Sequence, residues 1–236
     1  MRAPLALLVI AALLLQPVAA QELKPFIARY AWTYRGISAG QSTLSLARRD
    51  DGRWIYSSRS VARGIFRLIA PGDITQDSVF RLDGDQVLPE HYRGDDGTPA
   101  TKRDVNLTFD WHAHRVSGIY EDVPVDLPIE PGVHDDMSIQ VALMNDLLRG
   151  ITPMNFRLID RNLIKNYQYS QEGSLMLQTS LGLKKVVIYR SRKVGSRSST
   201  LFWCAPDLGY LPLKVERHDG ADKVEWAMSV QSASRE

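Results

Sequence analysis

The alternation of apolar and polar residues along most of the chain is the feature that most constrains its fold. Val105, Leu107 and Phe109, for example, are each separated by one polar residue. A period of two is that of a β-strand with one buried and one solvated face. Short turn sequences such as Asp50-Asp51-Gly52 separate the alternating runs. Runs joined by tight turns predict an antiparallel sheet.

The runs predict about a dozen strands, which is too many for a flat open sheet. The sequence therefore predicts a mainly β fold, built as an antiparallel curled sheet or a half-open β-barrel. A sequence Glu172-Gly173 predicts a turn between a strand ending at Ser170 and one beginning at Leu175. A central strand is excluded from the middle of the chain by three prolines, which cannot donate to a ladder: Pro124, Pro128 and Pro131.

Two segments depart from the period of two. One main α-helix is predicted at about 135–148, because apolar residues recur there at helical spacing: Ile139, Leu143 and Leu147. Asp135 or Asp136 can accept bonds from the free N–H groups at its start, and Gly150 suits its end. A short helix is predicted near residues 63–70, which Pro71-Gly72 follows.

The N-terminus has the three-part pattern of a secretory signal peptide. An apolar run, 5–15, follows Arg2, and cleavage is predicted before Gln21. The run is too short for the roughly 20 residues that a membrane-spanning helix requires. We expect residues 1–20 to be a signal peptide and 21–236 to be a single β-rich periplasmic domain. No later run is long enough to cross a membrane, so no transmembrane segment is expected in the mature chain.

The charges nearly balance, with 29 Lys and Arg residues against 27 Asp and Glu. This balance creates no field that would attract nucleic acid, so no nucleic-acid partner is predicted. Cys204 is the only cysteine, which excludes an intramolecular disulfide, and its apolar neighbours predict a buried, inert thiol. A local basic group indicates either a solvated strand face or a patch facing anionic lipid head groups: Lys184, Lys185, Arg190, Arg192, Lys193 and Arg197.

Two histidines form an H-x-H pair beside a carboxylate. His112 and His114 would share one face of a strand next to Asp110, which suits a metal such as zinc. No third ligand follows from the spacing, and a polar hairpin turn explains the pair better. No metal site is therefore predicted.

His134, Asp135 and Asp136 bring a base and two carboxylates to the start of the predicted helix. Such a set could perform general acid–base catalysis, but capping of the helix explains it better. The sequence contains no G-x-S-x-G, P-loop, H-E-x-x-H or G-x-G-x-x-G motif, so no catalytic residue and no cofactor are predicted. A hydrolase built on His134, Asp136 and Asp207 is the least favoured hypothesis.

Aromatic residues supply the candidate ligand-binding positions. Most fall where strands should face inward, and they could form an ordinary core. They could also line a cavity for an apolar ligand, since a curled sheet encloses an interior that side chains or a ligand must fill. The candidates are Trp32, Trp54, Phe66, Phe109, Tyr167 and Trp203.

Three stretches are similar to a known family. They are the aromatic strand that ends in glycines, 26–40, the helix start Asp135-Asp136-Met137-Ser138, and residues 203–212, which read WCAPDLGYLP. Together they resemble the domain of unknown function 3108 family (DUF3108) of exported bacterial proteins. The resemblance covers nearly the whole mature chain and implies a periplasmic β-rich domain without an assigned activity. More distantly, the architecture resembles the periplasmic lipoprotein carriers of the LolA and LolB type, which are half-open barrels lidded by helices around an apolar cavity.

These observations favour a non-catalytic periplasmic protein that binds or carries an apolar, lipid-like ligand in a β-barrel cavity. The alternative is a structural or assembly partner in the cell envelope that acts through protein–protein contacts at a surface or a sheet edge. The expected partners are accordingly an apolar or lipid ligand, or an envelope protein.

Overall fold

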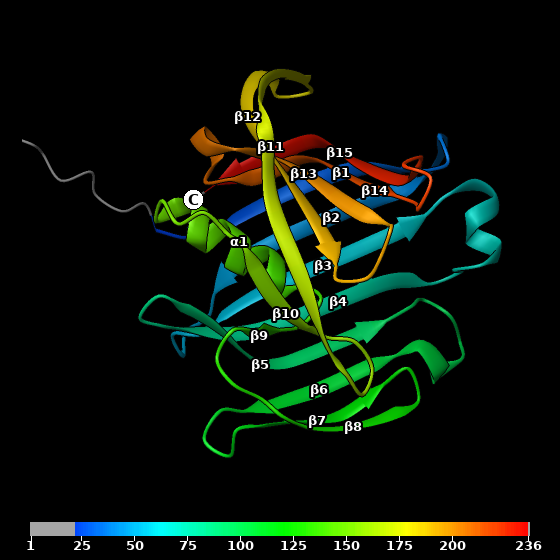
Figure 1. The fold of residues 1–236 in the computed structure, drawn as a ribbon. Coiled ribbons are helices and arrows are strands. Elements are labelled where there is room, and N and C mark those ends of the chain that lie inside the picture. Colours follow the sequence, from blue (N-terminus) through cyan, green and yellow to red (C-terminus); the bar gives the residue numbers. More distant parts are fainter. Residues whose placement is uncertain (1–21, 236) are drawn as a thin grey trace, which may run out of the picture.

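Fifteen strands form one continuous sheet in the computed structural model, which describes residues 22–235 (Figure 1). The strands of the first half are β1 (Phe26–Tyr34), β2 (Ile37–Arg48), β3 (Trp54–Ala62), β4 (Asp73–Asp83), β5 (Gln86–Asp95), β6 (Val105–Asp110), β7 (Arg115–Tyr120) and β8 (Val123–Pro128). Those of the second half are β9 (Val133–His134), β10 (Asn155–Ile159), β11 (Ile164–Thr179), β12 (Gly182–Lys193), β13 (Ser199–Ala205), β14 (Leu211–His218) and β15 (Val224–Arg235). The predicted mainly β fold is confirmed.

The sheet consists of two meanders that meet at the ends of the chain. Strands β1 to β8 lie side by side in sequence order, and so do β10 to β15. In the middle of the sheet β1 pairs antiparallel with β15, with Phe26 opposite Arg235 and Tyr34 opposite Trp226. The two-residue strand β9 pairs parallel with β10 at the far edge. All other neighbours among the described strands run antiparallel, as their short connections require.

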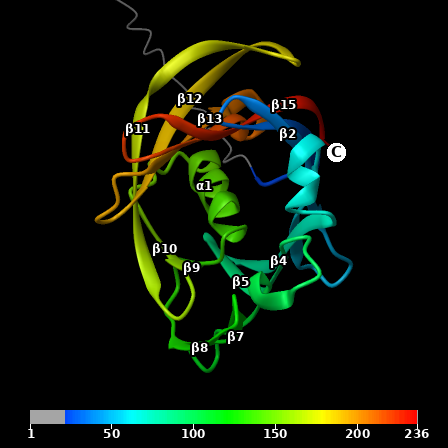
Figure 2. The ribbon, with the colours of Figure 1, turned by 90° about the vertical axis from the view of Figure 1, so that its right-hand side faces the viewer.

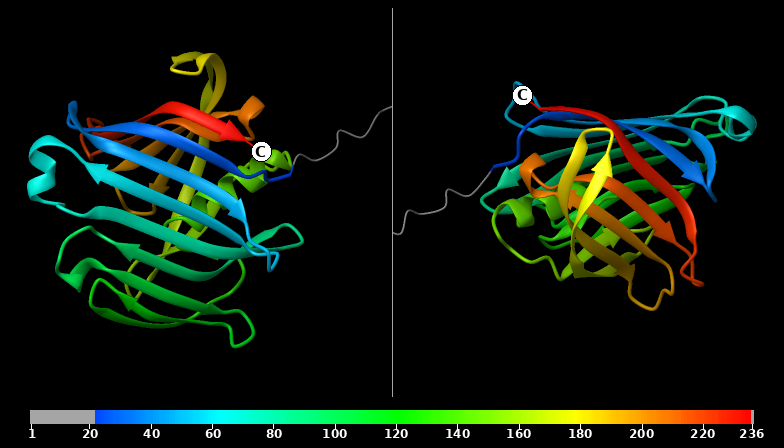
Figure 3. Two further views of the ribbon diagram at one scale, coloured as in Figure 1. Left: turned by 180° about the vertical axis from the view of Figure 1, so that it is seen from behind. Right: turned by 90° about the horizontal axis from the view of Figure 1, so that it is seen from above.

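The sheet curls but does not close into a barrel, so the half-open form of the prediction is correct (Figure 3). Its edges are β8 and β9, and no ladder joins these two strands. We call the side-chain contacts between 121–130 and 157–162 the seam. They are an ion pair of Arg161 with Glu121 at 2.7 Å, one of Arg157 with Glu130 at 3.3 Å, and a bond from the Asp126 N–H to Asn162 Oδ1 at 3.4 Å.

One row of side chains explains why the alternation predicts the strands. Six residues lie opposite one another from β1 to β6, on the same face of the sheet, and each is at most 2% exposed: Phe26, Leu46, Tyr56, Ser78, Tyr92 and Leu107. The row continues at Gly118 of β7, whose φ is 140°. A Cβ there would collide with the carbonyl oxygen of Asn106, so this position requires glycine.

The helix α1 (Ser138–Leu148) lies on the concave side of the curled sheet (Figure 2). Nine of its eleven residues are buried, because strands surround it on several sides. Leu143 and Met144 are fully buried at its centre. The predicted main helix is confirmed, and it lies within the curl of the sheet.

The turn before α1 satisfies the free N–H groups at the helix start. Asp135 Oδ1 accepts the N–H groups of Met137 and Ser138 at 2.8 and 2.7 Å. Asp135 Oδ2 accepts the hydroxyl of Ser78 on β4 at 2.7 Å, which ties the helix start to the sheet. Gly150 ends the helix with a φ of 74°. Of the two acids predicted as caps, Asp135 is therefore the one that does so.

Short 3-10 helices connect several strands: η1 (Gly64–Leu68), η2 (Thr101–Arg103) and η3 (Pro206–Leu208). The predicted short helix near 63–70 corresponds to η1. The predicted turn at Glu172-Gly173 is wrong, because β11 runs through it with a bulge between Gln171 and Gly173. Gly173 has a φ of 141°, so glycine here serves a bulge rather than a reversal of the chain.

Among residues 22–235, no helix has the length and apolar character needed to cross a membrane. The predicted signal peptide, 1–20, lies outside the described residues.

Candidate functional site

The six candidate aromatic residues do not surround one common space. Trp54, Phe109 and Trp203 are buried, whereas the other three are partly buried. Within the described chain, only Trp32 and Phe66 pair with each other, at a ring distance of 6.3 Å. Trp54 stacks on Phe80, and Phe109 stacks on Trp111. The Lys214 ammonium lies over the Trp203 ring at 4.6 Å. Trp54 also lines a surface hollow of about 520 Å³, and the ring contacts bring no more than two of the six candidates together.

Asp136 forms a polar cluster with two tyrosines from different strands. Its Oδ2 accepts the hydroxyl of Tyr120 at 2.7 Å and that of Tyr92 at 3.3 Å. Gln76 in turn donates to the Tyr92 hydroxyl at 2.9 Å. Burial raises the pKa of Asp136 to about 6, and the neighbouring Asp135 carboxylate adds to this, while the tyrosine bonds oppose it. The cluster therefore holds a carboxyl group that titrates close to neutral pH.

His134 does not act together with the carboxylates named beside it. Burial lowers the pKa of His134 to about 4, so its imidazole is neutral, and its Nδ1 has no hydrogen-bond partner among the described residues. Its ring packs edge-on against Phe156 at 5.7 Å. Asp207 pairs instead with Lys184 at 2.8 Å. No hydrogen bond within residues 22–235 links His134, Asp136 and Asp207 to one another.

His112 and His114 lie in the exposed turn between β6 and β7. Asp110 Oδ1 accepts the N–H groups of His112 and Ala113 at 3.0 and 2.8 Å, as an Asx turn requires. The carboxylate beside the histidines thus shapes a hairpin.

A different set of carboxylates comes together in the β5–β6 connection. Oxygens of Asp95, Asp96 and Asp104 lie within 4.8 Å of one another, the one such group in the described chain. Asp95 and Asp96 accept the N–H groups of Gly97 and Thr98 at 2.8 and 3.0 Å, so they also order the loop. Such oxygens could hold a hard cation. Sequence reasoning missed this cluster because Asp104 follows η2 and has no regular spacing from the others.

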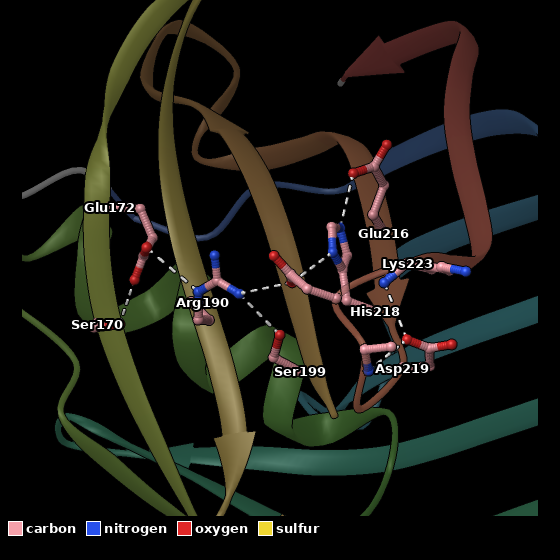
Figure 4. A network of polar contacts seen from close by, with 10 residues as sticks. Ser170, Glu172, Arg190, Ser199, Glu216, His218, Asp219 and Lys223 are labelled. Atoms are coloured by element: carbon pink, nitrogen blue, oxygen red, sulfur yellow. Dashed lines mark hydrogen bonds and ion pairs between the residues drawn. The ribbon is translucent and has the colours of Figure 1, made fainter. Parts of the chain in front are cut away.

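A polar network crosses β11, β12, β13 and β14 on one face of the sheet (Figure 4). At its centre, Arg190 contacts Glu172 at 3.3 Å, Ser199 at 3.0 Å and Asp222 at 3.8 Å. His218 continues the network, since its ring lies 3.1 Å from Glu216 and 3.0 Å from Asp222. These contacts hold the Arg190 guanidinium in place. Of the predicted basic group, Lys185, Arg192 and Arg197 remain exposed.

A surface groove of about 570 Å³ adjoins this network. Its walls come from three neighbouring strands: Asn155 of β10, Gln168, Ser170 and Glu172 of β11, and Arg190 and Arg192 of β12. Met154 and Tyr169 complete it with apolar surface. The groove is therefore polar, with fixed donors and acceptors, and differs from the apolar cavity that the aromatic residues suggest.

The groove lies where β10 ends and the edge of β11 becomes uncovered. β10 pairs with β11 only as far as Gln168, and the Met154 carbonyl accepts the Tyr169 N–H at 2.8 Å. Beyond this point, residues 170–179 pair with β12 alone among the described strands. Their end of the hairpin extends past β10 and arches over the sheet, where Lys184 pairs with Asp207 of η3 (Figures 1 and 2).

The other two sheet edges are protected. β8 carries Pro124 and Pro128, which cannot donate to a further strand, and the seam covers it. β9 is only two residues long. The segment 170–179 of β11 is therefore the long accessible edge of the described sheet.

The fold and surface together define a curled, half-open β-sheet protein built around a single helix. The chain belongs to the DUF3108 family, described as "Protein of unknown function (DUF3108)", whose model matches residues 29–225. This confirms the resemblance seen in the sequence. Comparison with curated proteins gives no match.

Solved structures with a similar fold come from other bacterial proteins. A β-barrel-like protein of the DUF1849 domain from Brucella abortus has a TM-score of 0.63 at 11% identity, covering 91% of this chain and 98% of that one. The MucA/MucB complex of Pseudomonas aeruginosa matches with a TM-score of 0.39 at 10% identity, over 90% of this chain and 52% of that chain. A protein with a YmcC-like fold from Bacteroides fragilis matches with a TM-score of 0.36 at 10% identity, over 90% and 96%. The first shares the fold, whereas the other two match only loosely.

Proposed function

We propose that this protein is a non-enzymatic component of the cell envelope that binds an extended segment of a partner protein along the free edge of β11. The observation that carries the proposal is the uncovered backbone of residues 170–179. The predicted signal peptide supports the compartment. We prefer this function to carriage of an apolar ligand because α1 occupies the concave side of the sheet.

The backbone geometry identifies which groups a partner strand would meet. The Tyr169 N–H faces β10, so alternate residues direct their N–H and C=O groups toward that edge. The bulge between Gln171 and Gly173 shifts this alternation by one residue. Ser174, Met176 and Gln178 consequently present their backbone groups to the open edge. An added strand would satisfy them, as in other cases of β-strand addition.

Side chains along this edge define the chemistry of the partner. Leu175 and Met176 are 42% and 55% exposed, so apolar side chains of a bound segment can pack against them. Arg192, which lines the groove, and Lys185, opposite Met176, are exposed and have no ion-pair partner within residues 22–235. The partner segment is therefore expected to combine apolar residues with Asp or Glu.

The experiment begins with a photo-crosslinking amino acid in place of Met176 in the full chain in cells. The adduct is identified, and the crosslinked segment is synthesised as a peptide. Binding of this peptide is then measured to the wild type, to Met176→Pro and to Met176→Ala. Proline removes an N–H that β12 does not use, whereas alanine keeps it and removes only the side chain.

We expect Met176→Pro to weaken binding at least about tenfold and Met176→Ala to weaken it much less. Hydrogen exchange of the complex should show new protection in 170–179. Arg192→Glu should weaken binding of an acidic peptide, and Arg197→Glu, an exposed arginine in the β12–β13 turn, serves as its control. A peptide that binds Met176→Pro as tightly as the wild type, or that leaves 170–179 unprotected, would contradict the proposal.

A further inference from the structure

Large apolar side chains are exposed together at one rim of the sheet, at the ends of β1 and β3. Ile65, Leu68 and Ile69 of the β3–β4 connection are 69%, 83% and 67% exposed. Ile37, which follows the β1–β2 turn, is 62% exposed. We call these four residues the apolar rim. Exposure of several large aliphatic side chains on one surface marks an interaction site rather than chance.

The fold presents the apolar rim in an ordered conformation. Phe66, which lies between the exposed residues in sequence, packs its ring 6.3 Å from Trp32 and 6.0 Å from Tyr34. The Ile69 N–H bonds to the Phe66 carbonyl at 3.1 Å, which closes the turn of η1. The Gly72 N–H bonds to the Gly97 carbonyl of the neighbouring connection at 2.8 Å. The exposed side chains thus belong to a connection that is fixed at its centre and at its end. Figure 1 shows this connection between β3 and β4 at one side of the sheet.

Three arginines lie on the two segments that carry the apolar rim. Arg63 precedes η1, Arg67 lies in its last turn, and Arg35 lies over the Tyr34 ring at 5.3 Å in the adjacent turn. None of these three arginines forms an ion pair with a described residue. The sequence contains no Asp or Glu in 26–49 or in 54–72. Asp73, the next acid, pairs with Arg59.

Exposed apolar side chains with unpaired arginines beside them fit the surface of an anionic bilayer. Aliphatic side chains gain by entering the boundary between head groups and acyl chains, while guanidinium groups reach the phosphates. Each basic residue near such a surface strengthens the attraction. A protein that bound here would need an apolar surface and acidic groups placed to match the rim. An anionic membrane offers acyl chains and phosphate groups over its whole surface.

We infer that the apolar rim docks on anionic lipid membranes, with Ile65, Leu68 and Ile69 among the lipid tails and Arg63 and Arg67 at the phosphate groups. This site uses different elements from the free edge of β11. It does not depend on the proposed function, and the two surfaces can be occupied at once.

Cosedimentation of the mature chain with lipid vesicles tests the inference. Vesicles of phosphatidylcholine with phosphatidylglycerol are compared with vesicles of phosphatidylcholine alone. We expect binding to the mixed vesicles, weakening as salt is raised, and little binding to phosphatidylcholine. The double variant Ile65→Ser/Leu68→Ser should lose at least about tenfold in affinity. Arg63→Gln/Arg67→Gln should lose about fivefold for each arginine.

Leu183→Ser is the matched control, because Leu183 is 58% exposed and lies on the β11–β12 hairpin. This variant should bind vesicles like the wild type. All changed residues are exposed, so unaltered thermal unfolding checks that each variant folds. Absence of binding to the mixed vesicles, or equal loss in Leu183→Ser, would overturn the inference. So would a dimer in light scattering that Ile65→Ser/Leu68→Ser dissociates without any vesicle binding, since the apolar rim would then bind a second copy.

Discussion

Replacement of Asp136 by asparagine should stabilise the protein at neutral pH and not at acidic pH. Burial raises the pKa of this carboxyl from 3.8 to about 6. The folded chain therefore holds a proton on Asp136 between these pH values that the unfolded chain releases. The contribution of Asp136 to stability is fully present below pH 4 and is lost as pH rises through about 6. Above that pH, the folded state contains an unfavourable ionised carboxylate.

The magnitude follows from the two pKa values. A change from 3.8 to about 6 corresponds to about 3 kcal/mol in the free energy of unfolding. Part of this is shared with Asp135, and the Asp136 side chain keeps some contact with water, so we expect about 2 kcal/mol. Asparagine has nearly the same shape, and its oxygen can still accept the Tyr120 hydroxyl.

The assay is urea unfolding of wild type and Asp136→Asn at about pH 4 and about pH 7.5. The difference between the two proteins is the quantity of interest, because the other titrating groups contribute equally to both. The advantage of the variant should grow by about 2 kcal/mol from the lower to the higher pH. Asp122→Asn, a change at an exposed turn residue, should show no such growth. A pH-independent difference for Asp136→Asn would refute the reasoning.

Three further predictions test the packing of the fold. Leu143→Ala, at the fully buried centre of α1, should cost about 2–5 kcal/mol in urea unfolding, as a cavity in a packed core does. Gly118→Ala should destabilise the fold by several kcal/mol or prevent soluble expression, because its Cβ would overlap the Asn106 carbonyl and its φ is 140°. Burial raises the pKa of the Cys204 thiol, so a thiol reagent should react with it only after unfolding; reaction at the rate of a free thiol in the native protein would contradict its burial.

Local structure could be predicted from the sequence because each strand has one buried face. The alternation arises because every second residue of a strand lies in a buried row, such as the one that runs from Phe26 to Leu107. The helix could be predicted from the spacing of Ile139, Leu143 and Leu147. The turn predicted at Glu172-Gly173 failed because glycine serves a β-bulge as well as a turn, and both require the same backbone freedom.

Contacts between distant segments could not be predicted in this way. Tyr92, Tyr120 and Asp136 come from β5, β7 and the turn before α1, and nothing in their spacing brings them together. The free edge of β11 likewise depends on where β10 ends. One signal was available for the apolar rim: helical spacing of Ile65, Phe66 and Ile69 predicted a helix, but only the fold shows that the helix lies at the surface.

The pairing of β1 with β15 determines the order in which this sheet can be completed. Of the described strands, β1 is made first and β15 last, so β1 gains this partner only after the thirteen strands between them have been made. Each meander can form its own hairpins early, because these contacts are local. The loop-closure entropy for joining the two meanders grows by only about 0.6 kcal/mol per doubling of length, yet the search for so distant a partner is slow. Until it ends, β1 and β15 each present an open edge, and open strand edges favour aggregation of the half-assembled chain.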